Sequence, residues 1–472
     1  MISEDTREDR TTAQNDAHVA EAGWENGSDN GRKDHEQWFV RLAVNLCRLV
    51  LGFVLVFSGY VKAIDPLGTQ YKIQDYLAAL GLQGVVPDVV TLGTSVVLSA
   101  FEFSLGIFVL FAIRRRLVSK LLLLLMGFMT AISVWVAMAN PVSDCGCFGD
   151  AVVLTNMETL LKNIVLMACA LVLWKWPMGM YRFISRSNQW IAINFTVLFI
   201  IVTSAYCLYK LPVFDFRPYH VGANILKGME IPEGAAQPQF ETTFVMEKNG
   251  ERREFLLEDY PDSTWQFIDS KTVQTAKGYV PPIHDFSIQL AEGDDITEEL
   301  LSRKGYLFLL ISPHLSNASD TNFGDIDQIY EYAQQEKVPF YCLTASTEGE
   351  IAHWENITGA EYPFCKTDET TLKTIIRSNP GLLLLKDGTI IRKWSHNALP
   401  KSNELTAPLN ELEIGQMPDD SVTKTITQVV LLFFLPLLLL TLADRTWAWS
   451  RYVRRRTRLL NIRKAKADEK EQ

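Results

Sequence analysis

Long apolar runs separated by short polar connections dominate the first half of the chain, and one more lies near the C-terminus. A helix needs about 20 mainly apolar residues to cross roughly 30 Å of hydrocarbon. The runs of that length predict six membrane-spanning helices: Phe39–Ile64, Val89–Ile113, Leu117–Ala139, Met157–Trp176, Trp190–Lys210 and Thr425–Ala443. The first four are clustered, which predicts a four-helix membrane domain over residues 39–176.

The remaining segments complete the predicted domain order. Residues 1–38 are polar and acidic, which predicts a disordered tail that is not a cleaved signal peptide. We expect a β-rich region over 211–277, an α/β domain over 278–415 and a basic tail over 444–472. The predicted fold class is therefore a multi-pass α-helical membrane protein that carries an extracytoplasmic α/β domain.

The orientation is predicted from lysine and arginine, which keep short loops in the cytoplasm. The alternate loops hold almost none of these residues. They gather instead after the second, fourth and sixth runs: Arg114, Arg115, Arg116, Lys175, Arg182, Arg186, Arg445 and Arg451. Both termini are thus expected in the cytoplasm of a bacterial cell, with the chain in the inner membrane and residues 211–424 outside. The net charge of −10 lies mainly in the N-terminal tail and the outside domain. We interpret the basic tail as a lipid anchor and expect no nucleic-acid partner.

Two cysteines one residue apart, Cys145 and Cys147, follow the third run on the predicted outer side. Disulfides persist on that side of the membrane. A bridge across one residue is strained, and strained bridges are the more oxidising and labile ones. A redox-active, catalytic pair, a static clip and two reduced thiols in a glycine-rich turn are all compatible with this spacing. A metal site is disfavoured, because two thiolates without a neighbouring histidine leave a zinc shell incomplete.

Three ionisable side chains, Arg48, Lys62 and Glu102, fall in or near the first two runs. Charges in hydrocarbon usually face a bundle interior and pair with one another. Counted from the cytoplasmic side at about 1.5 Å per residue, Arg48 and Glu102 reach similar depths and are expected to pair. Lys62 is expected to extend to the outer interface beside Asp65. The three residues either orient the helices or line a pocket for a ligand such as a quinone.

The outside domain begins with a predicted hairpin, Phe240–Met246 and Arg252–Leu257, around Asn249-Gly250, with a third strand at Thr264–Ile268. Strands and helices then alternate and end in a second hairpin. This order predicts a three-layer α/β domain: strands at Tyr306–Ser312, Val338–Thr344, Leu382–Lys386 and Thr389–Trp394, and helices at Asp325–Lys337, Glu350–Thr358 and Thr370–Arg377.

The other cysteines give weaker signals. Cys342 and Cys365 lie in or near predicted strands and are either bridged or two buried free thiols. The remaining three lie in apolar runs and are interpreted as packing residues: Cys47, Cys169 and Cys207. His314 and His396 lack a convergent ligand set and are interpreted as surface polar groups.

The membrane domain resembles the four-helix DoxX and MauE families in the segments Phe57–Pro66 and Lys72–Leu77 and in Glu102. The runs Cys145–Gly149 and Leu160–Asn163 resemble the methylamine-utilisation MauE branch. The resemblance implies a membrane component linked to thiol oxidation or to electron flow through quinone, which assists maturation of a disulfide-rich periplasmic partner. The arrangement is similar in outline to vitamin K epoxide reductase, but that enzyme's two-residue spacing between cysteines is absent.

Residues 278–402 resemble the redoxin branch of the thioredoxin superfamily, beginning at Val280–Ser287 and with Asn379-Pro380 at the place of that family's cis-proline. Where a redoxin carries its reactive cysteine, this chain reads Ser312–Ser316, which contains no thiol. The domain is therefore expected to lack thiol catalysis.

A small-solute transporter is disfavoured because the sequence shows no pair of broken helices or repeated halves. Two other functional hypotheses follow from these patterns. In the first, electrons pass between a periplasmic protein and the Cys145/Cys147 pair, with quinone as a possible onward acceptor and with the α/β domain docking the partner. In the second, the chain is a non-enzymatic docking or maturation scaffold, and the cysteines form a fixed clip.

Overall fold

The structure, a computed structural model, describes residues 38–142, 144–232, 234–235, 239–248, 251–256, 266–276, 278–418 and 422–471. The tail predicted over residues 1–38 lies outside this part of the chain except for its last residue, as does the turn predicted at Asn249-Gly250. The chain divides into two compact units, which are described separately: Met1–Leu208 with Pro212–Phe214 and Asp420–Gln472, and Tyr209–Leu211 with Asp215–Asp419.

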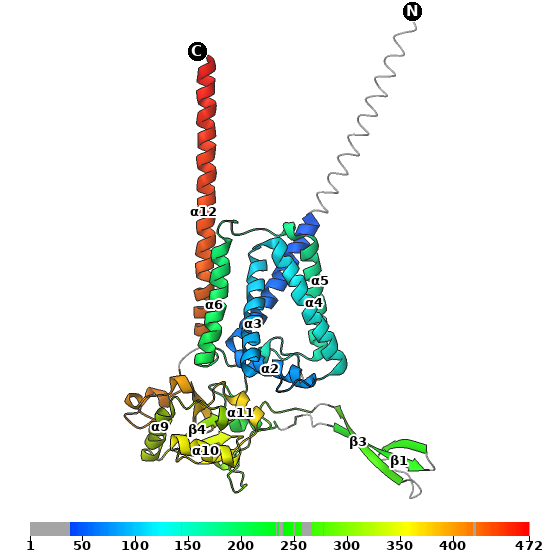
Figure 1. Ribbon diagram of the computed structural model, residues 1–472, viewed down its shortest axis with the longest axis vertical. Helices are drawn as coiled ribbons and strands as arrows, with labels where there is room; N and C mark the ends of the chain where they lie inside the picture. The colour runs from blue at the N-terminus through cyan, green and yellow to red at the C-terminus, as the bar shows by residue number, and fades with distance from the viewer. Residues whose placement is uncertain are drawn as a thin grey trace, which may run out of the picture. The chain divides into compact units, whose positions relative to one another are not determined.

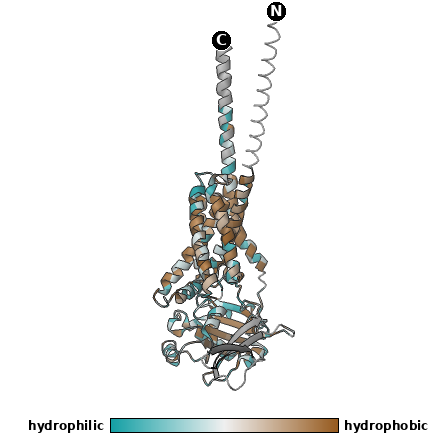
Figure 2. Ribbon diagram, turned by 90° about the vertical axis from the view of Figure 1, so that its right-hand side faces the viewer, coloured by the Kyte–Doolittle hydropathy of each residue, from teal (hydrophilic) through white to brown (hydrophobic). Residues whose placement is uncertain are grey.

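The first unit is a bundle of helices, coloured brown over most of its length in Figure 2 because the side chains are apolar. Among the described residues, six helices are long and apolar enough to cross a membrane, so the chain is a multi-pass membrane protein. All six predicted runs are confirmed as helices: Trp38–Ile64, α3 (Asp88–Leu110), α4 (Arg115–Ala139), α5 (Asn156–Lys175), α6 (Gln189–Tyr209) and α12 (Val422–Glu471).

Helix α12 is longer than predicted, because the predicted span and the basic tail form one continuous helix (Figure 1). Pro436 lies inside it, and no proline or glycine follows within the helix. The tail is rich in arginine, lysine, leucine and alanine, which favour helix. The helix is fixed to the α5–α6 loop through Asp444, whose carboxylate accepts hydrogen bonds from the Ser185 backbone and hydroxyl and from Asn188.

Helix α2 (Pro66–Ala79) was not predicted from the sequence and lies in the connection between the first helix and α3 (Figure 1). Its start is encoded locally, because the Asp65 side chain accepts from the Gly68 N–H at 2.9 Å. Proline is also favoured in the first turn, where its missing N–H costs nothing. This helix supplies two side chains to the cysteine loop.

Glycines set the contact between the first helix and α3. A Cβ atom on Gly59 would lie 2.4 Å from the backbone nitrogen of Phe103, and one on Gly106 would lie 2.7 Å from that of Val56. The two backbones can approach this closely only because neither glycine has a side chain. These contacts fix the register of the two helices.

The second unit contains a five-stranded sheet in the order β6-β5-β4-β7-β8. Strands β4, β5 and β6 are parallel, and β7 and β8 form the antiparallel end. All four predicted strands are confirmed and β6 is an addition: β4 (Tyr306–Ser312), β5 (Phe340–Thr344), β6 (Phe364–Lys366), β7 (Gly381–Lys386) and β8 (Thr389–Ser395). The Asn379–Pro380 bond is cis, as expected.

Helices cover both faces of this sheet and confirm the three-layer prediction. One buried cluster contains residues of α7, α8 and α11, and the other contains residues of α9 and α10. The bounds are α7 (Ile225–Met229), α8 (Thr297–Ser302), α9 (Phe323–Gln335), α10 (Glu348–Thr358) and α11 (Glu369–Ile375).

A separate three-stranded antiparallel sheet has the order β2-β1-β3. The predicted hairpin corresponds to β1 (Gln239–Lys248) and β2 (Glu251–Leu256). The third strand, β3 (Gln266–Ala276), begins inside the predicted range and continues well beyond it.

Candidate functional site

The two cysteines lie in the loop between α4 and α5, at the end of the bundle that also carries α2 (Figure 1). The thiols are free, and their Sγ atoms are 3.4 Å apart. Gly146 between them has φ +65, a left-handed conformation that suits glycine. Its N–H donates to the Asp144 carboxylate at 2.9 Å. The local sequence therefore folds into a tight turn that places both sulfurs together.

Helix α2 and the first helix hold the backbone of this turn. Lys72 of α2 forms an ion pair with Asp144 at 2.8 Å, and the Tyr76 hydroxyl donates to the Cys145 carbonyl at 2.9 Å. The Ser58 hydroxyl of the first helix lies 2.8 Å from the Cys147 carbonyl. The turn is thus fixed at each end by a side chain from another helix.

The next residue, Phe148, is held from two sides. Its ring lies 5.4 Å from that of Phe57, and the Lys162 ammonium of α5 lies 4.3 Å from its centre, a cation–π distance. The contact brings a positive charge close to the thiols.

The two thiols differ in acidity. The pKa of Cys147 is lowered to about 6, chiefly by the hydrogen bond that it shares with the Cys145 thiol and also by the nearby Lys162 and Lys62 ammonium groups, although burial opposes the shift. The pKa of Cys145 is raised by the same hydrogen bond and by burial. Cys147 is therefore the more acidic of the two thiols, and thiolates are the reactive form of cysteine.

Lys62 is buried and pairs with Glu102, which corrects two predictions: that Glu102 pairs with Arg48 and that Lys62 extends to the outer interface. The Lys62 Nζ atom lies 2.8 Å from both carboxylate oxygens, and both side chains are buried. The first prediction assumed that the first helix and α3 end at one level. Instead, Leu110 at the end of α3 lies against Gly52, so the first turns of the first helix extend past α3.

Arg48 lies at the C-terminal end of α3. Its guanidinium donates to the carbonyls of Leu110 and Tyr181 and to the Asn45 side chain. It is 14 residues before Lys62 in the same helix, which is about 21 Å at 1.5 Å per residue. Arg48 therefore does not converge with Lys62 and Glu102 at one site.

Ser58 connects the ion pair to the cysteine turn. Its hydroxyl lies 2.8 Å from a Glu102 carboxylate oxygen and 2.8 Å from the Cys147 carbonyl. A hydroxyl carries one proton, so it satisfies one of these acceptors fully at a time. The sequence did not assign Ser58, Lys72, Tyr76 and Lys162 to the site, although the segments that carry the family resemblance contain all four.

Cys342 and Cys365 are two buried free thiols, which decides between the two alternatives predicted for them. Cys365 pairs with Leu343 in the sheet, one residue from Cys342, so the two side chains point to opposite faces. Each thiol belongs to a different buried cluster. As predicted, Cys47, Cys169 and Cys207 pack within the helical bundle.

The turn after β4 holds hydroxyl and imidazole groups. The Ser312 hydroxyl is buried and donates to the Asn379 side chain at 2.7 Å, and His314 lies 3.0 Å from Glu369. His396 is not the surface group that was predicted, because it is half-buried with Nδ1 2.9 Å from the Ser378 hydroxyl. Among the described residues, no group of three or more histidine, cysteine or acidic side chains is arranged to hold a metal.

Comparison with known proteins gives two family matches. Residues 240–277 match a family described as a domain of unknown function (DUF8463). No curated protein matches the chain. Residues 40–175, which contain the cysteine turn and the Lys62–Glu102 pair, match the family described as methylamine utilisation protein MauE. The four-helix part of this chain is thus a MauE-like membrane domain.

Proposed function

We propose that Cys145 and Cys147 form a redox-active dithiol that exchanges disulfides with a periplasmic protein, and that the chain assists maturation of that protein in methylamine utilisation. The observation that carries the proposal is the pair of thiols 3.4 Å apart with Cys147 acidified to a pKa of about 6. Two lysines, Lys62 and Lys162, lie close enough to Cys147 to favour its thiolate, which is not required of thiols that only fill space. The methylamine context is supported by the description of the matched family.

The exchange proceeds in two balanced steps. When the pair is reduced, the Cys147 thiolate attacks one sulfur of a partner disulfide, and a mixed disulfide forms while the partner's second sulfur leaves as a thiolate and takes a proton. Cys145 then gives up its proton and attacks the Cys147 sulfur, which releases the partner as a dithiol. Two electrons pass to the partner. The reverse sequence oxidises a partner dithiol to a disulfide.

The acidity of Cys147 favours the oxidising direction. A low thiol pKa stabilises the reduced pair relative to its disulfide, so the disulfide is a good oxidant. A second disulfide-bearing protein can re-oxidise the pair by the same exchange. The exchange can therefore proceed between thiols and disulfides alone.

Lys62 and Lys162 act as positioning and charge-stabilising residues for Cys147. Lys62 is fixed by Glu102, and Lys162 by the Phe148 ring. Both ammonium groups favour the Cys147 thiolate. The two lysines come from different helices, so this electrostatic setting exists only in the folded bundle.

We further propose that the turn faces the periplasm, with both termini in the cytoplasm of a bacterial cell and the chain in the inner membrane. The arginines of the α3–α4 and α5–α6 loops support this orientation, because arginine keeps short loops in the cytoplasm. These arginines line a common pocket, and helices α4 and α5 each separate them from the cysteine turn by one membrane span. The α/β unit would then be periplasmic and dock the partner. Its sheet order and its parallel and antiparallel ends support a thioredoxin-like fold without the reactive cysteine.

The alternative is a non-enzymatic scaffold in which the two cysteines form a fixed clip. The ion pair of Lys72 with Asp144 and the Tyr76 hydrogen bond favour it, because they restrain the turn from moving. The two functions differ in one respect, since only the redox function requires a mixed disulfide with another protein.

Trapping in whole cells tests the proposal. The Cys145→Ser variant lacks the thiol that resolves the mixed disulfide, so acid quenching and alkylation are expected to preserve a reductant-sensitive adduct on a non-reducing gel. The Cys145→Ser/Cys147→Ser double variant is expected to lose the adduct, and Cys342→Ser, which removes a buried thiol, serves as the matched control. Absence of an adduct, or the same adduct in the double variant, would favour the scaffold.

A further inference from the structure

Five arginines and no carboxylate line a cavity of about 460 Å³ in the membrane unit. The lining residues come from the α3–α4 turn, from the start of α4 and from the α5–α6 segment: Arg114, Arg115, Arg116, Leu117, Met178, Arg182, Arg186 and Gln189. This volume lies in the range of small-molecule sites, about 300–1,000 Å³. The MauE match covers residues 40–175, so four of these residues lie beyond it.

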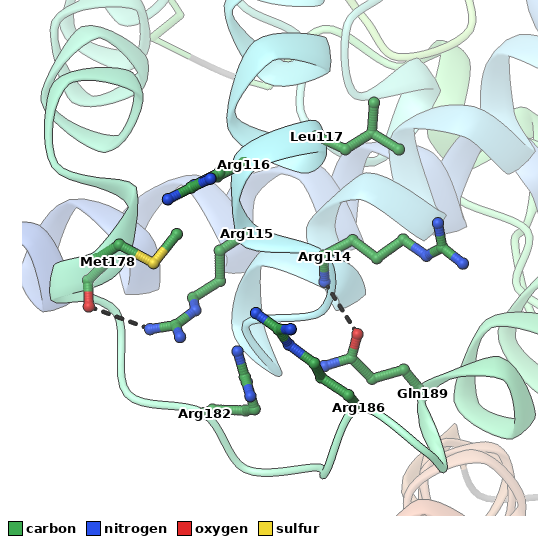
Figure 3. A pocket seen from close by; sticks show the side chains of 8 residues that line it. All are labelled: Arg114, Arg115, Arg116, Leu117, Met178, Arg182, Arg186 and Gln189. Atoms are coloured by element: carbon green, nitrogen blue, oxygen red, sulfur yellow. Dashed lines mark hydrogen bonds between the residues drawn. The ribbon is translucent and has the colours of Figure 1, made fainter.

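The walls of the cavity are fixed by contacts that leave most of the arginine head groups available. Arg115 donates to the carbonyls of Met178 and Met180 at 3.0 and 2.7 Å, which ties the start of α4 to the α5–α6 segment. The Arg114 backbone N–H donates to Gln189 at 3.3 Å. In Figure 3 the guanidinium groups of Arg115, Arg182 and Arg186 turn toward one another.

The positive charge of this cavity is not neutralised within the described part of the chain. The side chains of Arg114, Arg116 and Arg186 have no hydrogen-bond or ion-pair partner there. The Nε atoms of Arg115 and Arg182 are buried and also have no hydrogen-bond partner within the described part of the chain. The nearby carboxylate of Asp444 is already occupied by hydrogen bonds from Ser185 and Asn188.

The dipole of helix α4 further disfavours the arginines at the start of this helix. Arg115 and Arg116 are the first residues of the 25-residue helix α4, and its first turn holds no acidic residue. The N-terminus of a helix carries partial positive charge, which favours anions and disfavours cations. Loop arginines that served only to orient the chain would need neither a shared cavity nor this position.

We propose that this cavity binds a phosphate-bearing anion with at least two negative charges, either the headgroup of an anionic lipid or a soluble phosphate compound. Guanidinium groups bind phosphate oxygens in bidentate geometry, and a helix N-terminus adds backbone N–H donors. Basic pockets between membrane helices hold lipid headgroups of this kind. The site is independent of the cysteine turn and of the proposed redox function.

Thermal unfolding of the purified full chain tests the site in two arms. One arm titrates inorganic pyrophosphate into the protein in detergent. The other compares nanodiscs of phosphatidylcholine alone with nanodiscs that also contain cardiolipin. A ligand that binds only the folded state raises the unfolding temperature, so we expect a rise of several degrees in at least one arm. A rise with cardiolipin alone assigns a lipid headgroup, and a rise with pyrophosphate assigns a soluble phosphate compound.

The matched variants separate the site from general charge. Arg116→Gln/Arg186→Gln removes two arginines of the cavity, and Arg303→Gln/Lys304→Gln removes two exposed cations of the α/β unit, which belong to neither the cavity nor the basic tail. The first pair is expected to weaken the response by about tenfold or more in apparent affinity, as for lost charge-assisted hydrogen bonds, and the second to retain it. No rise in the unchanged protein, or equal loss in both pairs, would overturn the proposal.

Discussion

The Lys62 ammonium lies 2.8 Å from both carboxylate oxygens of Glu102, and the two side chains are only 6% and 3% exposed. A charge pair this deep in a membrane bundle is costly unless both members remain in contact. One side chain, Ser58, lies between this pair and the cysteine turn, with its hydroxyl 2.8 Å from Glu102 and 2.8 Å from the Cys147 carbonyl. It therefore links the packing of the first helix and α3 to the electrostatics of Cys147.

Removing one member of this pair is expected to be more harmful than removing both. Glu102→Gln leaves the Lys62 charge buried without a counter-charge and should lower the free energy of unfolding by about 3–5 kcal/mol. Replacing both residues, as in Lys62→Met/Glu102→Leu, should restore most of that loss. Chemical denaturation in detergent measures both effects. Equal destabilisation by the single and the double variant would contradict the account.

The glycine contact predicts a position-specific effect of alanine. Gly59→Ala places a Cβ atom 2.4 Å from the Phe103 nitrogen, so the two helices must separate, at a cost of about 1–3 kcal/mol. Gly93→Ala in α3 is the matched control, since no atom lies within 4 Å of its added Cβ. The control should be neutral or stabilise by up to about 1 kcal/mol. Similar unfolding curves for the two variants would disprove the proposed helix contact.

The reactivity of Cys147 should depend on pH with a midpoint near its pKa of about 6. Only the thiolate reacts, so the alkylation rate of the reduced protein should rise with pH and level off above that midpoint. Lys162→Met removes a positive charge that favours the thiolate, so the midpoint should move to higher pH. Peptide mass spectrometry after timed alkylation gives the rate, with Lys175→Met as the control. An unchanged midpoint in Lys162→Met would refute the role of that lysine.

The proposed orientation predicts which end of the bundle a membrane-impermeant maleimide reaches. After mild reduction, Cys147 should react in intact cells, whereas a cysteine placed at Arg116→Cys should react only after permeabilisation. The two positions lie at opposite ends of α4, so one gel reports both. Labelling of Cys147 only after permeabilisation would reverse the topology.

The sequence was sufficient for the six membrane-spanning helices and for most strands, because each is encoded by a local run of apolar residues. The Lys62–Glu102 pair was not predictable in the same way, since the relative level of two helices depends on where Gly52, Gly59 and Gly106 allow close approach. Helix α2 was missed because its polar residues carry no membrane signal. The arginine cavity also needed the fold, because its residues come from two separate connections.

The reduction potential of the Cys145–Cys147 pair tests the central claim most directly. The purified chain is equilibrated in glutathione buffers of defined potential, alkylated and analysed by mass spectrometry, with Cys147→Ser as the blank. An exchanging pair with an acidic thiol should be half reduced at about −200 mV or above, as thiol oxidants are. A pair that stays oxidised below about −300 mV would behave as a structural disulfide and contradict the redox function.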